Sequence, residues 1–171
     1  MKIICSKSSL LISVSIALKA VPSKTTMPIL ECILMDATTN QIKFTTNDME
    51  LGIETIVEGT IEEKGKVALD AKIFYEIIRR LPDNDVTIKT DDKYAATITC
   101  EKAKFNIPGK SGEDFAYLPM IEKDEPLTIS QYTLKEMIRQ TIFSIAINEN
   151  NKLMTGELFE IKNNCLKVVS L

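Results

Sequence analysis

The sequence predicts an α+β fold in which antiparallel sheets carry amphipathic helices on one face. Three observations lead to this prediction. A plan of strand, capping residue, helix and further strands recurs along the 171 residues, each helix carries one apolar stripe, and short alternating strands are separated by turn residues. The plan occurs twice in full and once in part. We therefore expect repeated β-α-β-β-β units.

The three copies of this unit begin alike, with an apolar strand that ends at a serine or an aspartate. Ser6, Asp70 and Ser130 stand at this position. Each can accept a hydrogen bond from a free N–H group in the first turn of a helix. A large apolar residue follows four positions later in every copy. The sequence therefore predicts that a helix begins directly after each of these three residues.

Each predicted helix carries apolar residues at the spacing of one helical face. The second helix has this spacing at Phe74, Ile77, Ile78 and Leu81. The third has it at Leu134, Met137, Ile138, Thr141, Ile142 and Ile145. The first has it at Leu10, Val14, Ala17, Leu18 and Val21, and Ile12 and Ile16 are expected to widen that stripe. Each helix is expected to bury its stripe against a sheet.

Runs of strands are expected after each helix. They are PILECILMDA, NQIKFTT and LGIETIVEGTI in the first copy, DVTIKT, YAATITC and AKFNIP in the second, and LMTGELFEI and CLKVVSL in the third. Turns are predicted at Asp91-Asp92-Lys93, around Glu101-Lys102 and at Asn163-Asn164. Two full copies make a domain over 1–120, residues 121–125 form a linker, and 126–171 form the first half of a second domain. We expect this half to pair with a second copy or to be poorly ordered.

Composition narrows the classes of function. Histidine is absent, which excludes Ser-His and Cys-His catalysis and His-ligated metals. The four cysteines lie far apart with no C-x-x-C pair, so buried free thiols are expected rather than a zinc or dithiol site. No apolar run reaches the length of a membrane span, and the N-terminal run is broken by polar residues. We expect a cytoplasmic protein without metal or cofactor.

The net charge of −3 hides an uneven distribution. The predicted helices lean basic, whereas acidic residues gather in the strands and loops. The helical cations are Lys72, Arg79, Arg80, Lys135 and Arg139. Two interpretations stay open: ordinary solvated helix faces, or a surface that faces phosphates. In the second case the lack of interleaved aromatic residues and of a glycine-rich loop favours weak, sequence-independent contact with the DNA backbone.

Two rival functions come from other classes. An enzyme that cleaves phosphodiesters would need several convergent carboxylates to bind a metal ion. The candidate pairs are Asp48 with Glu50 and Asp91 with Asp92. The second pair also reads as a hairpin turn. A small-ligand or protein-binding α+β module without DNA function would need a deep apolar pocket with converging polar groups. The sequence requires neither.

Several stretches, in this order and spacing, resemble one known family. They are MKIIC with SLL after it, TMPILECILM, TTNDMELGIE, VALDAKIFYEIIRRLP, KFNIPG with EDFAYLP, and LMTGELFEI. The chain resembles the bacterial DNA polymerase III β subunit, the ring-shaped sliding clamp. This resemblance implies a non-enzymatic processivity factor with three similar domains per chain. Two chains would close head to tail around duplex DNA, with helices lining the channel, sheets outside, and the replicative polymerase held on its template.

The resemblance also implies roles for individual residues. Lys24 falls where the family has a basic residue that touches DNA, and Asn148 and Lys152 fall by position in a loop that does likewise. Residues of an edge strand that pairs with the partner chain are Lys104, Phe105 and Ile107. Met154 and Leu171 match positions beside a hydrophobic cleft for short peptides of polymerases and the clamp loader. The resemblance covers the first domain and about half of the second, so this chain is not expected to close a ring alone. It is expected in the cytoplasm, associated with the nucleoid.

Overall fold

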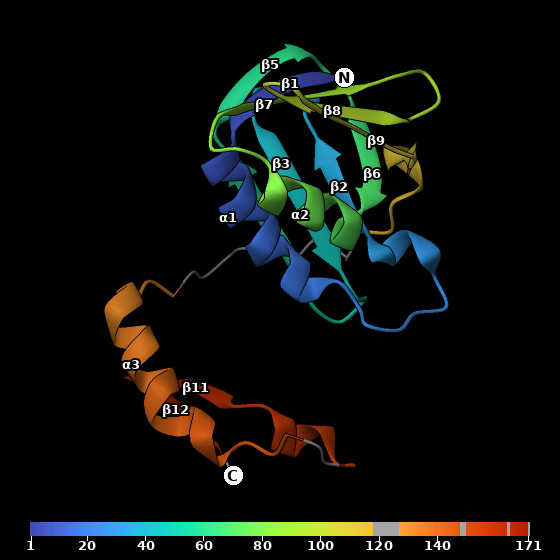
Figure 1. Cartoon of the computed structure of the whole chain (residues 1–171). Coiled ribbons are helices and arrows are strands. Elements are labelled where there is room, and N and C mark those ends of the chain that lie inside the picture. Colours follow the sequence, from blue (N-terminus) through green and yellow to red (C-terminus); the bar gives the residue numbers. More distant parts are fainter. Residues whose placement is uncertain (118–126, 148–149, 164, 171) are drawn as a thin grey trace. The chain divides into compact units, whose positions relative to one another are not determined.

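The computed structural model describes residues 1–117, 127–147, 150–163 and 165–170 (Figure 1). Contacts between Cα atoms divide the chain into two compact units, Met1–Met120 and Ile121–Leu171, which we call unit 1 and unit 2. The predicted linker at 121–125 lies outside the described residues.

Unit 1 consists of two halves with one plan. The first half contains β1 (Lys2–Ser6), α1 (Lys7–Ala17), β2 (Cys32–Asp36), β3 (Ile42–Asn47), β4 (Gly52–Val57) and β5 (Gly59–Glu63). The second half contains β6 (Lys66–Asp70), α2 (Ala71–Arg80), β7 (Asp85–Thr90), β8 (Ala96–Cys100), β9 (Ala103–Ile107) and β10 (Gly109–Ser111). Short 3-10 turns are η1 (Leu18–Ala20), η2 (Pro28–Glu31) and η3 (Gly112–Asp114). The predicted strand LGIETIVEGTI is thus divided into β4 and β5, whereas AKFNIP forms β9 alone. Strand β10 is one that the sequence did not predict, and the segment PILE forms a 3-10 turn.

The two halves of unit 1 exchange strands in a symmetric way. One sheet has the order β5-β1-β7-β8-β9 and the other β10-β6-β2-β3-β4, all antiparallel. Exchanging the halves therefore converts one order into the other. The chain passes from one sheet to the other between β4 and β5 and again between β9 and β10, so we call β5 and β10 the crossing strands. Both begin at a glycine, because a Cβ atom on Gly59 would collide with the Ile4 carbonyl oxygen and one on Gly109 with the Tyr94 carbonyl oxygen. Each half thus completes the sheet of the other.

The predicted helix caps are confirmed in unit 1. The Ser6 hydroxyl oxygen accepts a hydrogen bond from the Ser9 N–H at 3.2 Å, and the Asp70 carboxylate accepts one from the Ile73 N–H at 2.8 Å. Helices α1 and α2 lie side by side (Figure 1). They bury their stripes in a core that they share with both sheets. The expectation for two residues of α1 was wrong: Ile12 is 61% exposed and Ile16 41% exposed. They lie on the outer side of a helix that has sheet on one side only.

Unit 2 contains one helix and one hairpin among its described residues. Its elements are α3 (Gln131–Thr141), η4 (Ile142–Ser144), η5 (Lys152–Thr155), β11 (Leu158–Lys162) and β12 (Cys165–Val169). The Ser130 cap is confirmed, because its hydroxyl oxygen accepts a hydrogen bond from the Thr133 N–H at 3.1 Å. The hairpin is confirmed too, with Asn163 at a positive φ of 48° in its turn.

Four expectations for unit 2, one of them on a cysteine, were wrong. Residues 127–130 do not form a strand, since no described strand of unit 2 lies beside them to supply hydrogen bonds. The predicted strand LMTGELFEI forms a 3-10 turn first and becomes extended only from Leu158. Helix α3 buries none of its described residues. Cys5, Cys32 and Cys100 are buried free thiols as expected, but Cys165 is exposed on β12.

Candidate nucleic-acid interface

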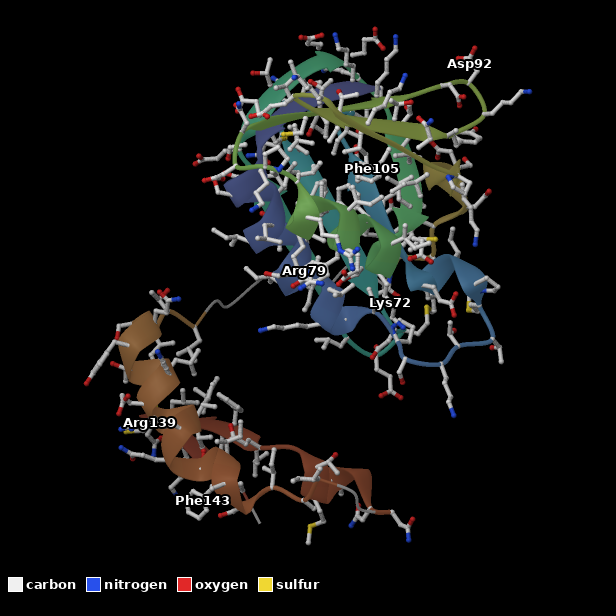
Figure 2. All side chains as sticks on the ribbon, in the orientation of Figure 1. Lys72, Arg79, Asp92, Phe105, Arg139 and Phe143 are labelled. Atoms are coloured by element: carbon white, nitrogen blue, oxygen red, sulfur yellow. The ribbon has the colours of Figure 1, made fainter. Side chains whose placement is uncertain are left out.

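Helix α2 presents three cations on its solvent side. Lys72 is exposed, and the side chains of Arg79 and Arg80 are 51% and 74% exposed. Figure 2 shows Lys72 and Arg79 on this helix, whereas Asp92 lies in the β7–β8 hairpin turn, away from both. The hydrophobic stripe turns Phe74 and Ile78 into the core, so the sequence itself directs the cations outward.

One acid on α2 is shared by both arginines. The Glu76 carboxylate lies 2.7 Å from the Arg79 guanidinium and 3.4 Å from that of Arg80. The hydrogen bond from Arg79 holds the pKa of the Glu76 carboxyl below its usual range. Three cations against one acid leave a charge of +2 on this face. The spacings i, i+3 and i, i+4 could have revealed these pairs in the sequence.

Unit 2 repeats this arrangement on α3. Lys135 is exposed, and the Glu136 carboxylate lies 2.8 Å from the Arg139 guanidinium, whose side chain is 70% exposed. In unit 1, Lys24 is exposed in the loop after η1. Asn148 lies outside the described residues, as does the side chain of Lys152. The cations of unit 1 and those of unit 2 are each accessible, and a surface common to both units stays a prediction.

Three acids on the strand side of unit 1 form ion pairs with lysines. The ammonium-to-carboxylate distances are 2.6 Å for Lys2–Glu62, 3.0 Å for Lys43–Glu54 and 2.8 Å for Lys66–Glu113. The hydrogen bond to Glu62 raises the pKa of Lys2, and the bond to Glu113 raises that of Lys66. These three pairs offset part of the negative charge on this side of unit 1. The acidic cluster at 122–125 lies outside the described residues.

The edge strand β9 borders a groove of about 360 Å³ next to α2. It is lined by Lys72, Ile73, Glu76, Ile77, Arg80 and Phe105. Phe105 is 39% exposed and Ile73 is 51% exposed, so the groove presents apolar side chains next to charged ones. Lys104 is exposed beside it. Ile107, by contrast, is 2% exposed and belongs to the core, so its side chain does not suit the predicted contact with a partner chain.

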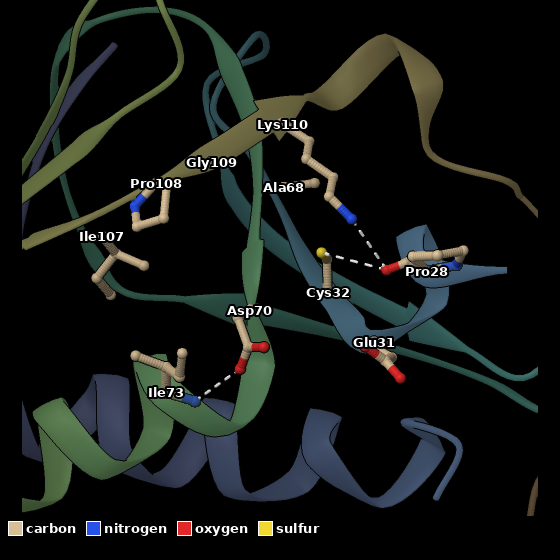
Figure 3. Close-up of a pocket in the computed structure, with 10 residues that line it drawn as sticks. All are labelled: Pro28, Glu31, Cys32, Ala68, Asp70, Ile73, Ile107, Pro108, Gly109 and Lys110. Carbon is tan, nitrogen blue, oxygen red and sulfur yellow. Dashed lines mark hydrogen bonds between the residues drawn. The ribbon is translucent and has the colours of Figure 1, made fainter. Parts of the chain in front are cut away.

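A second cavity, of about 240 Å³, lies between β2, β6 and β10 (Figure 3). Three of its polar side chains are engaged within the protein rather than converging on the space. The Asp70 carboxylate caps α2, and the Lys110 ammonium donates to the Pro28 carbonyl oxygen at 3.2 Å. The Cys32 thiol points to the same carbonyl oxygen, and burial raises its pKa. The cavity is smaller than most ligand pockets, and this arrangement does not favour a small-ligand site.

One carboxylate of each pair considered for catalysis acts in a turn. One Asp48 oxygen accepts hydrogen bonds from the Glu50 and Leu51 N–H groups, at 2.9 and 2.7 Å. Asp91 accepts two in the same way, from the Lys93 and Ala95 N–H groups. In the described part of the chain, no three His, Cys, Asp or Glu side chains come together as metal ligands, and no helix is long and apolar enough to cross a membrane.

Met154, predicted to lie beside a peptide-binding cleft, is 36% exposed in η5. Its carbonyl oxygen accepts a hydrogen bond from the Ala146 N–H at 2.8 Å, and its own N–H donates to the Asn151 carbonyl oxygen at 3.0 Å. The first of these bonds ties η5 to the segment that follows η4. The second predicted cleft residue, Leu171, lies outside the described residues.

Comparisons with known proteins agree with one another. The family model "DNA polymerase III beta subunit, N-terminal domain" matches residues 1–119. The chain is 35% identical to a beta sliding clamp of Synechocystis sp., over 91% of this chain and 42% of that protein. It is also 35% identical to the beta sliding clamp of Bacillus subtilis, over 95% and 45%.

Solved structures show the same likeness. A putative DNA polymerase III beta subunit from Eubacterium rectale is 68% identical, with a TM-score of 0.93 over 100% of this chain and 47% of that chain. The DNA polymerase sliding clamp of Bacillus subtilis is 33% identical, with a TM-score of 0.90 over 99% and 47%. The chain thus spans less than half the length of these relatives.

Proposed function

The chain belongs to the DNA polymerase III β-subunit family, and from this premise we propose that it forms part of a non-catalytic sliding clamp around double-stranded DNA. Since the chain spans 42% to 47% of its relatives, ring closure is proposed for an assembly that includes their remaining length. In such an assembly the clamp would tether the replicative polymerase to its template in the cytoplasm, at the nucleoid.

The mechanism we propose is enclosure rather than tight binding. A closed ring stays on DNA because the duplex passes through it, so contacts with phosphates need only be weak. Weak contacts from lysine and arginine side chains carry no sequence information and let a protein slide. Chemistry on the DNA is not required of the clamp, which fits the turn roles of Asp48 and Asp91.

The observation that carries this proposal is the exposed basic face of α2. Its charge of +2 stands on a helix packed into the core of unit 1, so the cations are presented by a rigid element. Lys24, Lys135 and Arg139 are the further candidates for contact with phosphates. Because the ion pairs with Glu76 and Glu136 offset part of the charge, attraction to DNA should be moderate.

The proposed protein contacts use two other places. Lys104 and Phe105 on the edge strand β9 would meet the partner chain of a homodimeric ring, since an edge strand has backbone groups free to pair. The region of Met154 would contribute to a cleft for short apolar peptides of the polymerase and the clamp loader. Both belong to the same proposal and depend on the longer assembly.

Charge reversal on α2 tests the proposed contact with DNA. Binding of a fluorescent duplex is measured by anisotropy over a series of low salt concentrations. We expect Lys72→Glu with Arg79→Glu to weaken binding and to lower the salt slope by about 1.8, at about 0.9 for each lost phosphate contact.

Lys89→Glu with Lys93→Glu is the matched control, because it changes the net charge equally in and near the β7–β8 turn. It should leave the salt slope nearly unchanged. Equal weakening by both pairs would mean that binding reports net charge alone, and the proposal for α2 would fail.

A further inference from the structure

Two stretches of the sequence that the basic face of α2 does not explain meet on one sheet of unit 1. They are TTNDMELGIE, at the β3–β4 turn, and the start of EDFAYLP, after β10. In this sheet β2 is buried on both faces from Cys32 to Met35, whereas its counterpart β7 alternates between buried and accessible residues. A second buried cluster, separate from the core under the helices, consists of Cys32, Leu34, Ala68 and Phe115. Residues 109–117 therefore cover the outer face of this sheet, and we call them the strap.

The strap is attached to the sheet at its start and in its middle. Its first residues form β10, which pairs with β6. Phe115 is 3% exposed, and its ring meets that of Tyr117 edge to face, with 5.7 Å between the ring centres. The ion pair between Lys66 and Glu113 adds little, because the Glu113 side chain is 76% exposed and exposed pairs contribute little to stability. Up to Phe115 the strap is thus held by strand pairing and by one buried ring.

The end of the strap is held by the side-chain amide of Asn47, the last residue of β3. Its Nδ2 donates a hydrogen bond to the Ala116 carbonyl oxygen at 2.7 Å, across 69 positions of the sequence. Its Oδ1 accepts one from the Met49 N–H at 3.2 Å, in a turn where Met49 has a positive φ of 76°. Asn47 is 1% exposed, so water does not readily replace a partner that its amide loses. One buried amide thus ties the β3–β4 turn to the end of the strap.

We infer that Asn47 is a positioning residue, which fixes the place on unit 1 where the chain leaves for unit 2. From Tyr117 the chain continues through residues 118–126 to unit 2. With the amide bond in place, the chain is held to the end of β3. Without it, the last residues of the strap separate from the sheet, and the place of exit is no longer fixed. The consequence for DNA rests on the proposed function, because a fixed exit limits how far neighbouring domains of a ring can move apart.

Replacing the amide by a carboxylate removes the donor and keeps the acceptor. In Asn47→Asp the side chain can still accept from the Met49 N–H but cannot donate to Ala116. Hydrogen exchange is measured on the whole chain. The Glu113 and Phe115 amides, both hydrogen-bonded within the strap, should exchange about tenfold faster than in the native chain. The amides of β2 and β7 should keep their native rates.

Asn106→Asp is the matched control for the same chemical change. Asn106 is exposed on β9, and its Oδ1 accepts a hydrogen bond from the Thr97 hydroxyl at 2.9 Å. A carboxylate accepts this bond equally well. The exchange rates of the strap should therefore stay native in this variant.

Two further measurements separate the lost donor from the buried charge. Asn47→Ala is neutral and should speed exchange of the same strap amides; if Asn47→Asp does not fold, this variant decides alone. Acid should reverse the effect of Asn47→Asp, because the protonated carboxyl regains an O–H donor. Burial raises the pKa of such a carboxyl, so its exchange relative to the native chain should fall toward one between about pH 7 and about pH 5.

The inference is overturned by any of three results. They are native exchange of the strap in both Asn47 variants, equal acceleration of the β2 and β7 amides, and the same acceleration in Asn106→Asp. The second result would mean that Asn47 supports the whole of unit 1 rather than the strap. None of the three bears on the proposed contact of α2 with DNA, because the experiment contains no DNA.

Discussion

Units 1 and 2 are built on one plan but differ in how much of it they bury. In unit 1 the stripe residues Leu10 and Phe74 are fully buried, whereas α3 of unit 2 buries none of its described residues. The difference lies not in the helices, which share a serine or aspartate cap and the same apolar spacing. It lies in the second half, which unit 1 contains and the described residues of unit 2 do not include. Local structure forms in both units, whereas the buried core of unit 1 is built from both of its halves.

The largest expected difference concerns the apolar stripes. Phe74→Ala should lower the free energy of unfolding of unit 1 by about 3–5 kcal/mol, because it removes a fully buried ring and its contact with Phe44. Leu134→Ala at the equivalent position of half-buried α3 should cost only about 1–2 kcal/mol. Urea unfolding followed by hydrogen exchange resolves the two units. Equal costs would mean that unit 2 has a core of its own.

The helix caps should behave alike in both units. Ser6→Ala and Ser130→Ala each remove a hydrogen bond to the first helical turn, and each should cost about 1 kcal/mol. Hydrogen exchange of the first-turn amides measures the change in each helix separately. Ser6→Thr and Ser130→Thr are the conservative controls and should lose much less. A large effect in one unit alone would contradict a purely local role.

The two units should also differ in the reactivity of their cysteines, without any change in stability. Cys165 is exposed and should react with iodoacetamide at least ~100-fold faster than Cys5, Cys32 or Cys100, which react only when unit 1 opens. Mass spectrometry of a time course locates the label, and Cys165→Ser removes the fast phase. Rapid labelling of all four thiols in the native protein would show that the core of unit 1 is loose.

The buried thiols also make a prediction for alkaline pH. Burial raises the pKa of the Cys5 thiol to about 12, and burial raises those of Cys32 and Cys100 as well. The unfolded chain releases these protons from about pH 8.5 upward while the folded chain keeps them. Stability is therefore complete below that pH and falls above it, by at most about 1.4 kcal/mol per pH unit for each thiol. Cys5→Ala should flatten the dependence measured by urea unfolding.

Much of the local structure was predictable because it depends on neighbours in the sequence. Ser6, Asp70 and Ser130 cap helices through atoms three residues away, and the turns at Asp91 and Asn163 depend on their own backbone. The exposure of the α2 cations was predictable as well. The apolar stripe of this helix faces the core, so the cations, which are not part of the stripe, lie on the solvent side. The ion pairs of Glu76 follow from its spacing to Arg79 and Arg80.

Other features depended on contacts between distant segments. Only the sheets reveal that the crossing strands begin at Gly59 and Gly109, where another backbone passes too close for a side chain. The burial of Ile107 and the exposure of Ile12 depend on which faces the second half covers. The missing strand at 127–130 has the same cause, because a strand exists only where a partner supplies its hydrogen bonds. By itself the sequence determined the caps, turns and stripes of each unit, and the tertiary structure decided which stripes became a core.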